Sequence, residues 1–145
     1  MRIFLDTNVV VSAVATRGLC ADMLREILIH HELVISDSLI KELKRGLCKK
    51  LGVPEDLVSE LVEVLQKESH FSTSSALPNI DIQDKDDLTI LSCALNGKAA
   101  FFITGDKELL GLKRIGDMKI VSPRMFWERL KAQQTDEHIL ELRCT

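Results

Sequence analysis

The chain has 145 residues, of which 46% are hydrophobic and 28% charged, a composition typical of one folded domain rather than a disordered protein. Aromatic residues make up only 4%, which argues against a surface that stacks bases on aromatic rings. The net charge of -3 argues against a general polyanion binder, unless some of the acids bind metal ions.

The first half of the chain alternates between short apolar runs and amphipathic stretches. An apolar run at residues 3–5 ends at Asp6 and predicts a buried strand, and a helical stretch follows until Gly18. An amphipathic helix is expected at 21–30 and a second strand at 33–35. Two further helices follow, one capped by Ser36 and carrying Leu39, Leu43 and Leu47, the other opened by Pro54 and carrying Leu57, Leu61 and Leu65.

The second half continues the alternation after an irregular segment. Residues 69–79 are rich in serine, and we expect at most a brief strand at their start. The elements expected after them are a helix at 84–96, a strand at 100–103, a short helix at 107–112, a strand at 119–121 and a helix through 123–130. The tail after Gln133 has no clear stop signal, so it is either a terminal helix or loose. Strands alternating with helices predict a parallel sheet with helices on both faces.

Nothing in the sequence indicates a zinc site or a membrane segment. The four cysteines lack zinc spacing, and Cys20 and Cys93 lie in apolar stretches that predict buried thiols. No apolar run approaches the roughly 20 residues of a membrane span. Because no signal peptide precedes the first strand, we expect a cytoplasmic protein.

Four acidic residues are expected to meet at one edge of the sheet. Asp6 and Asp106 directly follow predicted strands, and the carboxyl ends of parallel strands share an edge. Glu42 and Asp87 lie shortly after the starts of helices that begin at that same edge. Asp87 lies on the side of its helix that carries apolar residues, where a carboxylate needs a partner.

A cluster of carboxylates predicts a divalent cation. Two carboxylates about 4 Å apart repel each other by several kcal/mol at an effective dielectric near 20, and a hard cation removes that cost. Oxygen ligands from Asp and Glu suit Mg²⁺ or Mn²⁺, and one or two such ions can activate a water against a phosphodiester. No Ser–His–Asp or Cys–His arrangement competes with this chemistry.

Each acid also has a purely structural interpretation. Asp6 and Asp106 can cap the helices that follow them, and Glu42 can be a solvated helix acid. Asp86 remains an alternative to Asp87 as the third acid. Two polar groups and four basic residues have two interpretations each. Asn8 and Thr104 either hydrogen-bond a ligand carboxylate or shape turns, and four basic residues either contact RNA or serve solubility, namely Lys44, Arg45, Lys49 and Lys50. The acidic run that consists of Glu55, Asp56, Glu60 and Glu63 is interpreted as a solvated helix face.

Five segments of the sequence match a known family, namely FLDTNVVVSA, SDSLIKEL, DKDDLTILSCALNGKA, FFITGDKELLGL and IVSPRMFWERL. In this order they resemble a PIN (PilT N-terminus) domain. The resemblance covers about residues 1–131 and leaves 132–145 as a C-terminal tail. Within this family the chain is most similar to the toxin components of toxin–antitoxin pairs related to VapC-type toxins. Lys85 occupies a position where the commoner family form has proline.

The resemblance implies a three-layer α/β/α sandwich around a central parallel sheet of four or five strands. It also implies an Mg²⁺- or Mn²⁺-dependent endoribonuclease, a homodimer, and inhibition by a small antitoxin protein. The family's catalytic and metal-binding acids fall on four positions of this sequence, Asp6, Glu42, Asp87 and Asp106. Asn8 and Thr104 match the polar positions that flank the first and last acids.

Our leading hypothesis is a toxin that cleaves single-stranded RNA by metal-activated water. A phosphotransfer domain, either receiver-like or phosphatase-like, is a weaker alternative, because such phosphatases need Asp-x-Asp after the first strand and Asn8 occupies the third place. A non-catalytic interaction module with the same fold is the other alternative.

Overall fold

The computed structural model describes residues 1–74, 82 and 84–144, with side chains described up to residue 133. The strands of this part of the chain form one sheet. Its strand order is β3-β2-β1-β4-β6-β5, and all neighbours pair in parallel except β5, which is antiparallel to β6. The parallel part therefore has five strands, as expected, and β5 is a two-residue addition that no sequence period could reveal. The strands are β1 (Arg2–Leu5), β2 (Glu32–Ser36), β3 (Ser69–Ser72), β4 (Phe101–Ile103), β5 (Arg114–Ile115) and β6 (Met118–Val121).

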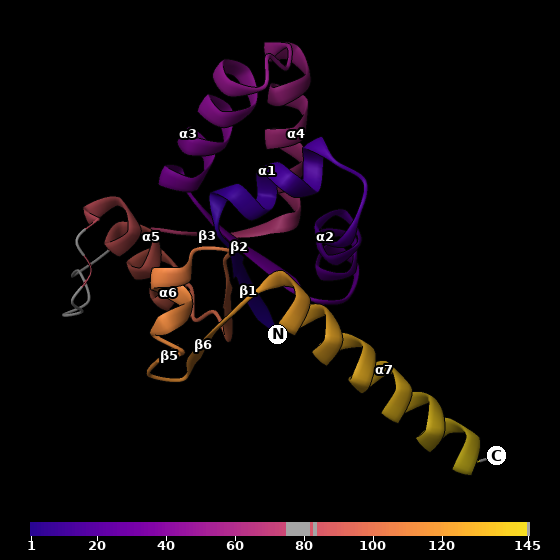
Figure 1. Ribbon diagram of the computed structural model, residues 1–145. Coiled ribbons are helices and arrows are strands. Elements are labelled where there is room, and N and C mark those ends of the chain that lie inside the picture. Colours follow the sequence, from indigo (N-terminus) through magenta and orange to yellow (C-terminus); the bar gives the residue numbers. More distant parts are fainter. Residues whose placement is uncertain (75–81, 83, 145) are drawn as a thin grey trace.

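Helices cover both faces of the sheet, which confirms the predicted three-layer α/β/α class. Figure 1 shows α1 to α4 on one side of the sheet and α5 and α6 on the other. The helices are α1 (Thr7–Ala15), α2 (Leu19–His30), α3 (Asp37–Arg45), the π-helical turn η1 (Gly46–Lys50), α4 (Glu55–Glu68), α5 (Lys85–Asn96), α6 (Lys107–Gly111) and α7 (Pro123–Cys144).

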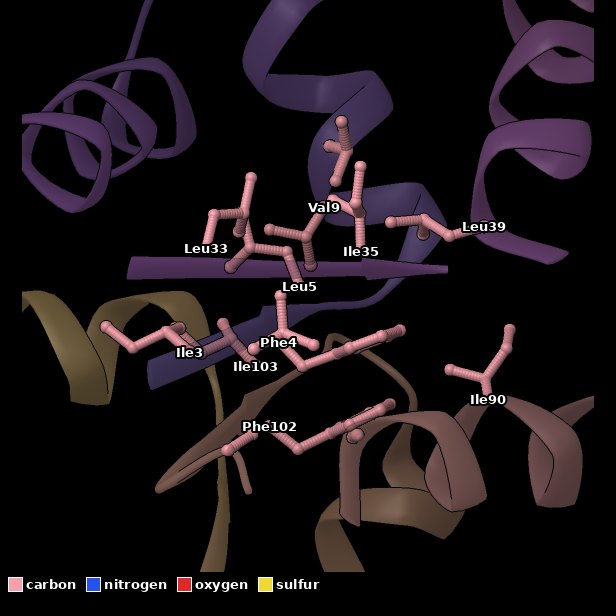
Figure 2. Close-up of a cluster of buried hydrophobic side chains, with 14 of the residues drawn as sticks. Ile3, Phe4, Leu5, Val9, Leu33, Ile35, Leu39, Ile90, Phe102 and Ile103 are labelled. Atoms are coloured by element: carbon pink, nitrogen blue, oxygen red, sulfur yellow. The ribbon is translucent and has the colours of Figure 1, made fainter. Parts of the chain in front are cut away.

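The core lies on both faces of the central strands β1 and β4. Side chains alternate along a strand, so Phe4 and Leu5 point to opposite faces. Phe4 pairs in register with Phe102, and their rings stack with centroids 5.4 Å apart. Figure 2 shows these rings on the α5 side, with Leu5 and Leu33 toward α1. Burying each such side chain stabilises the fold by roughly 1.5–3 kcal/mol.

Two helices differ from the sequence prediction. The helix that was expected to continue through Leu47 ends at Arg45 and passes into the π-turn η1. Gly46 is a poor helix former, and the wider turn keeps Leu47 buried in the core. On α4 the buried residues are Val58, Val62 and Leu65 rather than a leucine repeat, and Leu57 is 56% exposed. A strict four-residue repeat drifts around a helix that has 3.6 residues per turn.

The C-terminal helix α7 begins as predicted and continues to Cys144. Ser122 caps it, since its hydroxyl accepts a hydrogen bond of 3.2 Å from the Met125 amide. Figure 1 shows α7 leading away from the sheet toward the C-terminus. Within the described residues, no helix combines the length and the apolar character needed to cross a membrane. The assignment of residues 132–145 to a separate tail stays a prediction.

Other local predictions can be compared directly with the structure. The brief strand expected near Ser69 is β3, whereas residues 75–79 of that segment lie outside the described residues. Cys93 is buried as expected, but Cys20 is only half-buried. The Ser36 cap is present, because its hydroxyl accepts a hydrogen bond of 3.2 Å from the Leu39 amide.

Candidate active site

Asp6 lies directly after β1, at the carboxyl edge of the sheet, and caps α1. One carboxylate oxygen accepts a hydrogen bond of 2.8 Å from the Thr7 amide, and the other accepts one of 2.8 Å from the Thr104 hydroxyl. Burial raises the pKa of Asp6 above its ordinary value and the charge of Asp106 adds to the rise, while the two hydrogen bonds oppose it. The carboxylate is therefore fixed in orientation and carries a charge that burial disfavours.

Thr104 links the first and last predicted acids. It is fully buried at the end of β4, where its hydroxyl donates to Asp6 and accepts a hydrogen bond of 3.0 Å from the Asp106 amide. Asp106 caps α6, since its Oδ1 accepts hydrogen bonds from the amides of Glu108 at 2.8 Å and Leu109 at 3.4 Å. The capping interpretation of Asp106 is thus correct, and the same residue also lines the cavity described below.

Glu42 belongs to α3 and lines the same cavity as Asp6. Its Oε2 accepts a hydrogen bond of 2.7 Å from the hydroxyl of Thr7, which is 8% exposed. Sequence reasoning did not single out Thr7, although its position between Asp6 and Asn8 was the available signal. Asn8 is exposed in the wall of the same cavity.

Asp87 lies on the first turn of α5 and is half-buried. Burial is the largest cause that raises the pKa of Asp87, from 3.8 to about 6, followed by the negative charges of Asp84, Asp6, Asp106 and Glu108. A carboxylate on α5 therefore senses carboxylates that follow β1 and β4. This electrostatic coupling indicates that the acids share one region.

Two neighbouring acids complete this side of the site. Asp84 caps α5, because its Oδ1 accepts a hydrogen bond of 2.9 Å from the Asp86 amide. Asp84 and Asp86 are exposed, whereas Asp87 is half-buried. Burial thus distinguishes Asp87 from Asp86, although both line the same cavity.

A cavity of about 410 Å³ brings these residues together. Its acidic lining consists of Asp6, Glu42, Asp84, Asp86, Asp87 and Asp106. Arg45 and Lys50 line another part of the wall. No His, Ser or Cys is among the described residues that line it, so the cavity contains no hydroxyl or thiol nucleophile paired with a histidine base.

The donor set fits a hard divalent cation in chemistry and location. All six acids offer oxygen ligands, and none forms a salt bridge within the described part of the chain. However, no three His, Cys, Asp or Glu side chains among the described residues already form a group that could hold an ion. A cation would therefore require some of these side chains to turn toward a shared point.

Comparison with known proteins identifies the family. A chain of VapBC2 from Rickettsia felis, whose structure is of the protein bound to a DNA fragment from its promoter, is 21% identical, with a TM-score of 0.61 over 84% of this chain and 98% of that chain. A chain of VapBC-1 from nontypeable Haemophilus influenzae is also 21% identical, with a TM-score of 0.56 over 86% of this chain and 99% of that chain. No curated protein sequence is a significant match.

At this level of identity, the two structures support the fold and no more. The family model for the PIN domain matches residues 2–108, which is well over half of the sequence and includes all four predicted acids. This chain belongs to the PIN domain family.

Proposed function

We propose that the protein is a metal-dependent endoribonuclease that acts in the cytoplasm as the toxin of a toxin–antitoxin pair. The observation that carries the proposal is the acidic cavity, in which Asp6, Glu42, Asp87 and Asp106 arrive from four separate elements. Burying acids next to one another costs stability, as the raised pKa of Asp87 indicates. Such a cost is typical of a functional site.

The chain's own groups hold the carboxylates in position for this chemistry. Thr104 and the Thr7 amide fix the two oxygens of Asp6, and the Thr7 hydroxyl orients Glu42. Asp6, Glu42, Asp87 and Asp106 would hold Mg²⁺ or Mn²⁺. When bound, such an ion lowers the pKa of a water and stabilises the charge that develops on a phosphodiester. Attack by water with departure of the 3′-oxygen, rather than attack by the ribose 2′-hydroxyl, leaves a 3′-hydroxyl on one product and a 5′-phosphate on the other.

Cleavage of single-stranded RNA by the purified protein tests this proposal. We expect cleavage with Mn²⁺ or Mg²⁺, none with EDTA, and 3′-hydroxyl product ends. Asp6→Asn should lower the rate by at least about 100-fold, because it removes a charged ligand while keeping the side-chain shape. Asp117→Asn is the matched control, since Asp117 is exposed and does not line the cavity. Activity that survives Asp6→Asn unchanged would mean a contaminating nuclease and would end the proposal.

The non-catalytic interaction module remains a second candidate because no metal cage is preformed among the described residues. Isothermal titration with Mn²⁺ separates the two candidates. The nuclease should bind Mn²⁺, and Asp6→Asn should weaken that binding, whereas the absence of any Mn²⁺ binding favours the module.

An antitoxin partner and a homodimer complete the proposal. The similarity to chains of VapBC2 and VapBC-1 supports a small partner protein. Co-expression of the protein encoded beside this chain's gene should relieve its toxicity and copurify with it. Analytical ultracentrifugation should give twice the 16.3 kDa mass of one chain. A monomer at all concentrations would contradict the homodimer without affecting the nuclease assignment.

A further inference from the structure

A second cavity adjoins the acidic one and has the opposite charge. It measures about 390 Å³ and lies between η1 and α4. Its lining includes Lys44, Arg45 and Lys49, with Glu55 as the one acid among the described residues. Arg45 lines both cavities, so the two are contiguous along α3 and η1. A basic strip, defined as Lys44, Arg45, Lys49 and Lys50, therefore leads from one cavity to the other.

The π-turn explains how these cations come to lie in two matched pairs. In an α-helix, residues five apart point roughly 140° away from each other. In a π-turn the hydrogen bond spans five residues, as in the 3.2 Å bond from the Leu51 amide to the Gly46 carbonyl. Residues five apart then lie on nearly the same side of the helix. Accordingly, Arg45 and Lys50 both line the acidic cavity, whereas Lys44 and Lys49 both line the second one, which Arg45 also borders.

The four cations are available to a ligand. All are exposed, and none forms a salt bridge with another described residue. Their concentration is unusual for a chain whose net charge is -3. Basic residues that serve only solubility would not be expected to gather in the linings of two adjoining cavities, as these four do.

The charge around the acidic cavity determines the direction in which a nucleic-acid strand can leave it. Asp84, Asp86 and Asp106 are exposed acids of its lining, and they repel the phosphates that flank a bound phosphodiester. Only the α3–η1 side offers cations among the described lining residues. A strand with one phosphate in the acidic cavity is therefore drawn out over the π-turn.

We propose that the basic strip is the track for the backbone of the single-stranded RNA substrate. This inference rests on the proposed nuclease function and names the surface that positions its substrate. Arg45 and Lys50 contact the phosphate next to the cleaved one, and Lys44 and Lys49 contact phosphates further along. No aromatic residue is among the described residues that line either cavity, so the track reads phosphates rather than bases.

RNA binding by a cleavage-deficient protein tests the track. In the Asp6→Asn background, the affinity for a fluorescein-labelled oligouridylate is measured by anisotropy over a series of salt concentrations at a fixed, low Mg²⁺ concentration. Each phosphate contact contributes about 0.7 to the slope of log affinity against log salt for a single strand. The pair Lys44→Gln/Lys49→Gln should lower that slope by about 1.4 and weaken binding about 25-fold near 0.1 M salt.

The control pair is Lys98→Gln/Lys119→Gln, which removes the same charge from exposed positions at the opposite edge of the sheet. It should change the affinity by less than about twofold, and circular dichroism should show that all variants are folded. Equal losses in the two pairs, or no loss in either, would overturn the track. The track is also wrong if Lys44→Gln/Lys49→Gln weakens binding of polyglutamate but not of RNA, because the strip would then be an acidic-peptide site.

The same experiment separates the two proposals. If the wild type cleaves RNA with Mn²⁺ but both pairs bind it equally, only the track fails. If the wild type does not cleave RNA and the Asp6→Asn parent does not bind it, the proposed nuclease function fails together with the track.

Discussion

Replacing Asp87 with asparagine should stabilise the metal-free protein while abolishing its activity. The pKa of Asp87 is raised from 3.8 to about 6, first by burial and then by the charges of Asp84, Asp6, Asp106 and Glu108. At neutral pH the carboxylate is ionised in both states, so the folded state bears a cost of up to roughly 3 kcal/mol. Asp87 is half-buried and water screens part of this cost, so we expect Asp87→Asn to gain about 1.5 kcal/mol.

The pH dependence has a definite sign. Because the folded-state pKa of Asp87 lies above the unfolded one, the folded protein binds the proton more tightly between about pH 4 and 6. The wild type therefore loses stability relative to Asp87→Asn as the pH rises through this window. The two proteins should converge near pH 4, where Asp87 is protonated in the folded state.

Urea denaturation in EDTA, followed by circular dichroism at about pH 7.5 and at about pH 4.5, measures both effects. Glu60→Gln is the control, since Glu60 is exposed on α4 and is not among the described residues that line the cavity. Added Mn²⁺ should reverse the order, because only the wild type gains the binding free energy of the ion. A destabilised Asp87→Asn in EDTA, or a stabilisation that does not change with pH, would refute the electrostatic reasoning.

Three further predictions concern the site support and the core. Thr104→Val should remove the hydrogen bond to Asp6, lower the free energy of unfolding in urea by about 1.5–3 kcal/mol and lower RNA cleavage by about 10–100-fold. Thr104→Ser keeps the hydroxyl and should retain both the stability and the cleavage rate. Equal effects of the two variants would contradict a role for the hydroxyl. Gly97→Ala should cost about 1–3 kcal/mol, because the added carbon would lie 2.5 Å from Val34 Cγ1, and an unchanged urea midpoint would show that the site has room. Phe102→Ala should cost about 3–5 kcal/mol in the same assay, and a loss below about 1 kcal/mol would mean that the stacked ring pair is not part of a tightly packed core.

The sequence was sufficient to predict the sheet and the placement of two acids. Parallel strands carry unbroken apolar runs, and their carboxyl ends share an edge by topology, so the positions of Asp6 and Asp106 followed from order alone. Helical periodicity placed Glu42 and Asp87 near that edge, and the structure brings all four into the lining of one cavity. Their roles in metal binding and catalysis stay predictions.

The features that the sequence did not reveal depend on tertiary contacts or on local geometry. Thr7 could not be assigned to Glu42, because a hydrogen bond across 35 positions leaves no periodic signal. A π-turn has no propensity pattern of its own, so the sequence could not predict that Arg45 and Lys50, five residues apart, line the same cavity. Strand β5 is two residues long and exists through its pairing with β6. The sequence favoured Asp87 over Asp86 only through its apolar neighbours on the helix, and the difference in burial between the two required the structure.

The central position of β1 has a consequence for protein synthesis. This strand is translated first, yet one of its two neighbours is β4, and Ile3 pairs with Phe101. A nascent chain therefore carries β1 with one flank open until β4 has left the ribosome. Asp106 follows β4, so the acidic lining is incomplete until 106 of the 145 residues have been made. Translation products that end before Asp106 therefore lack the complete acidic lining, and the proposed nuclease activity should be absent from them.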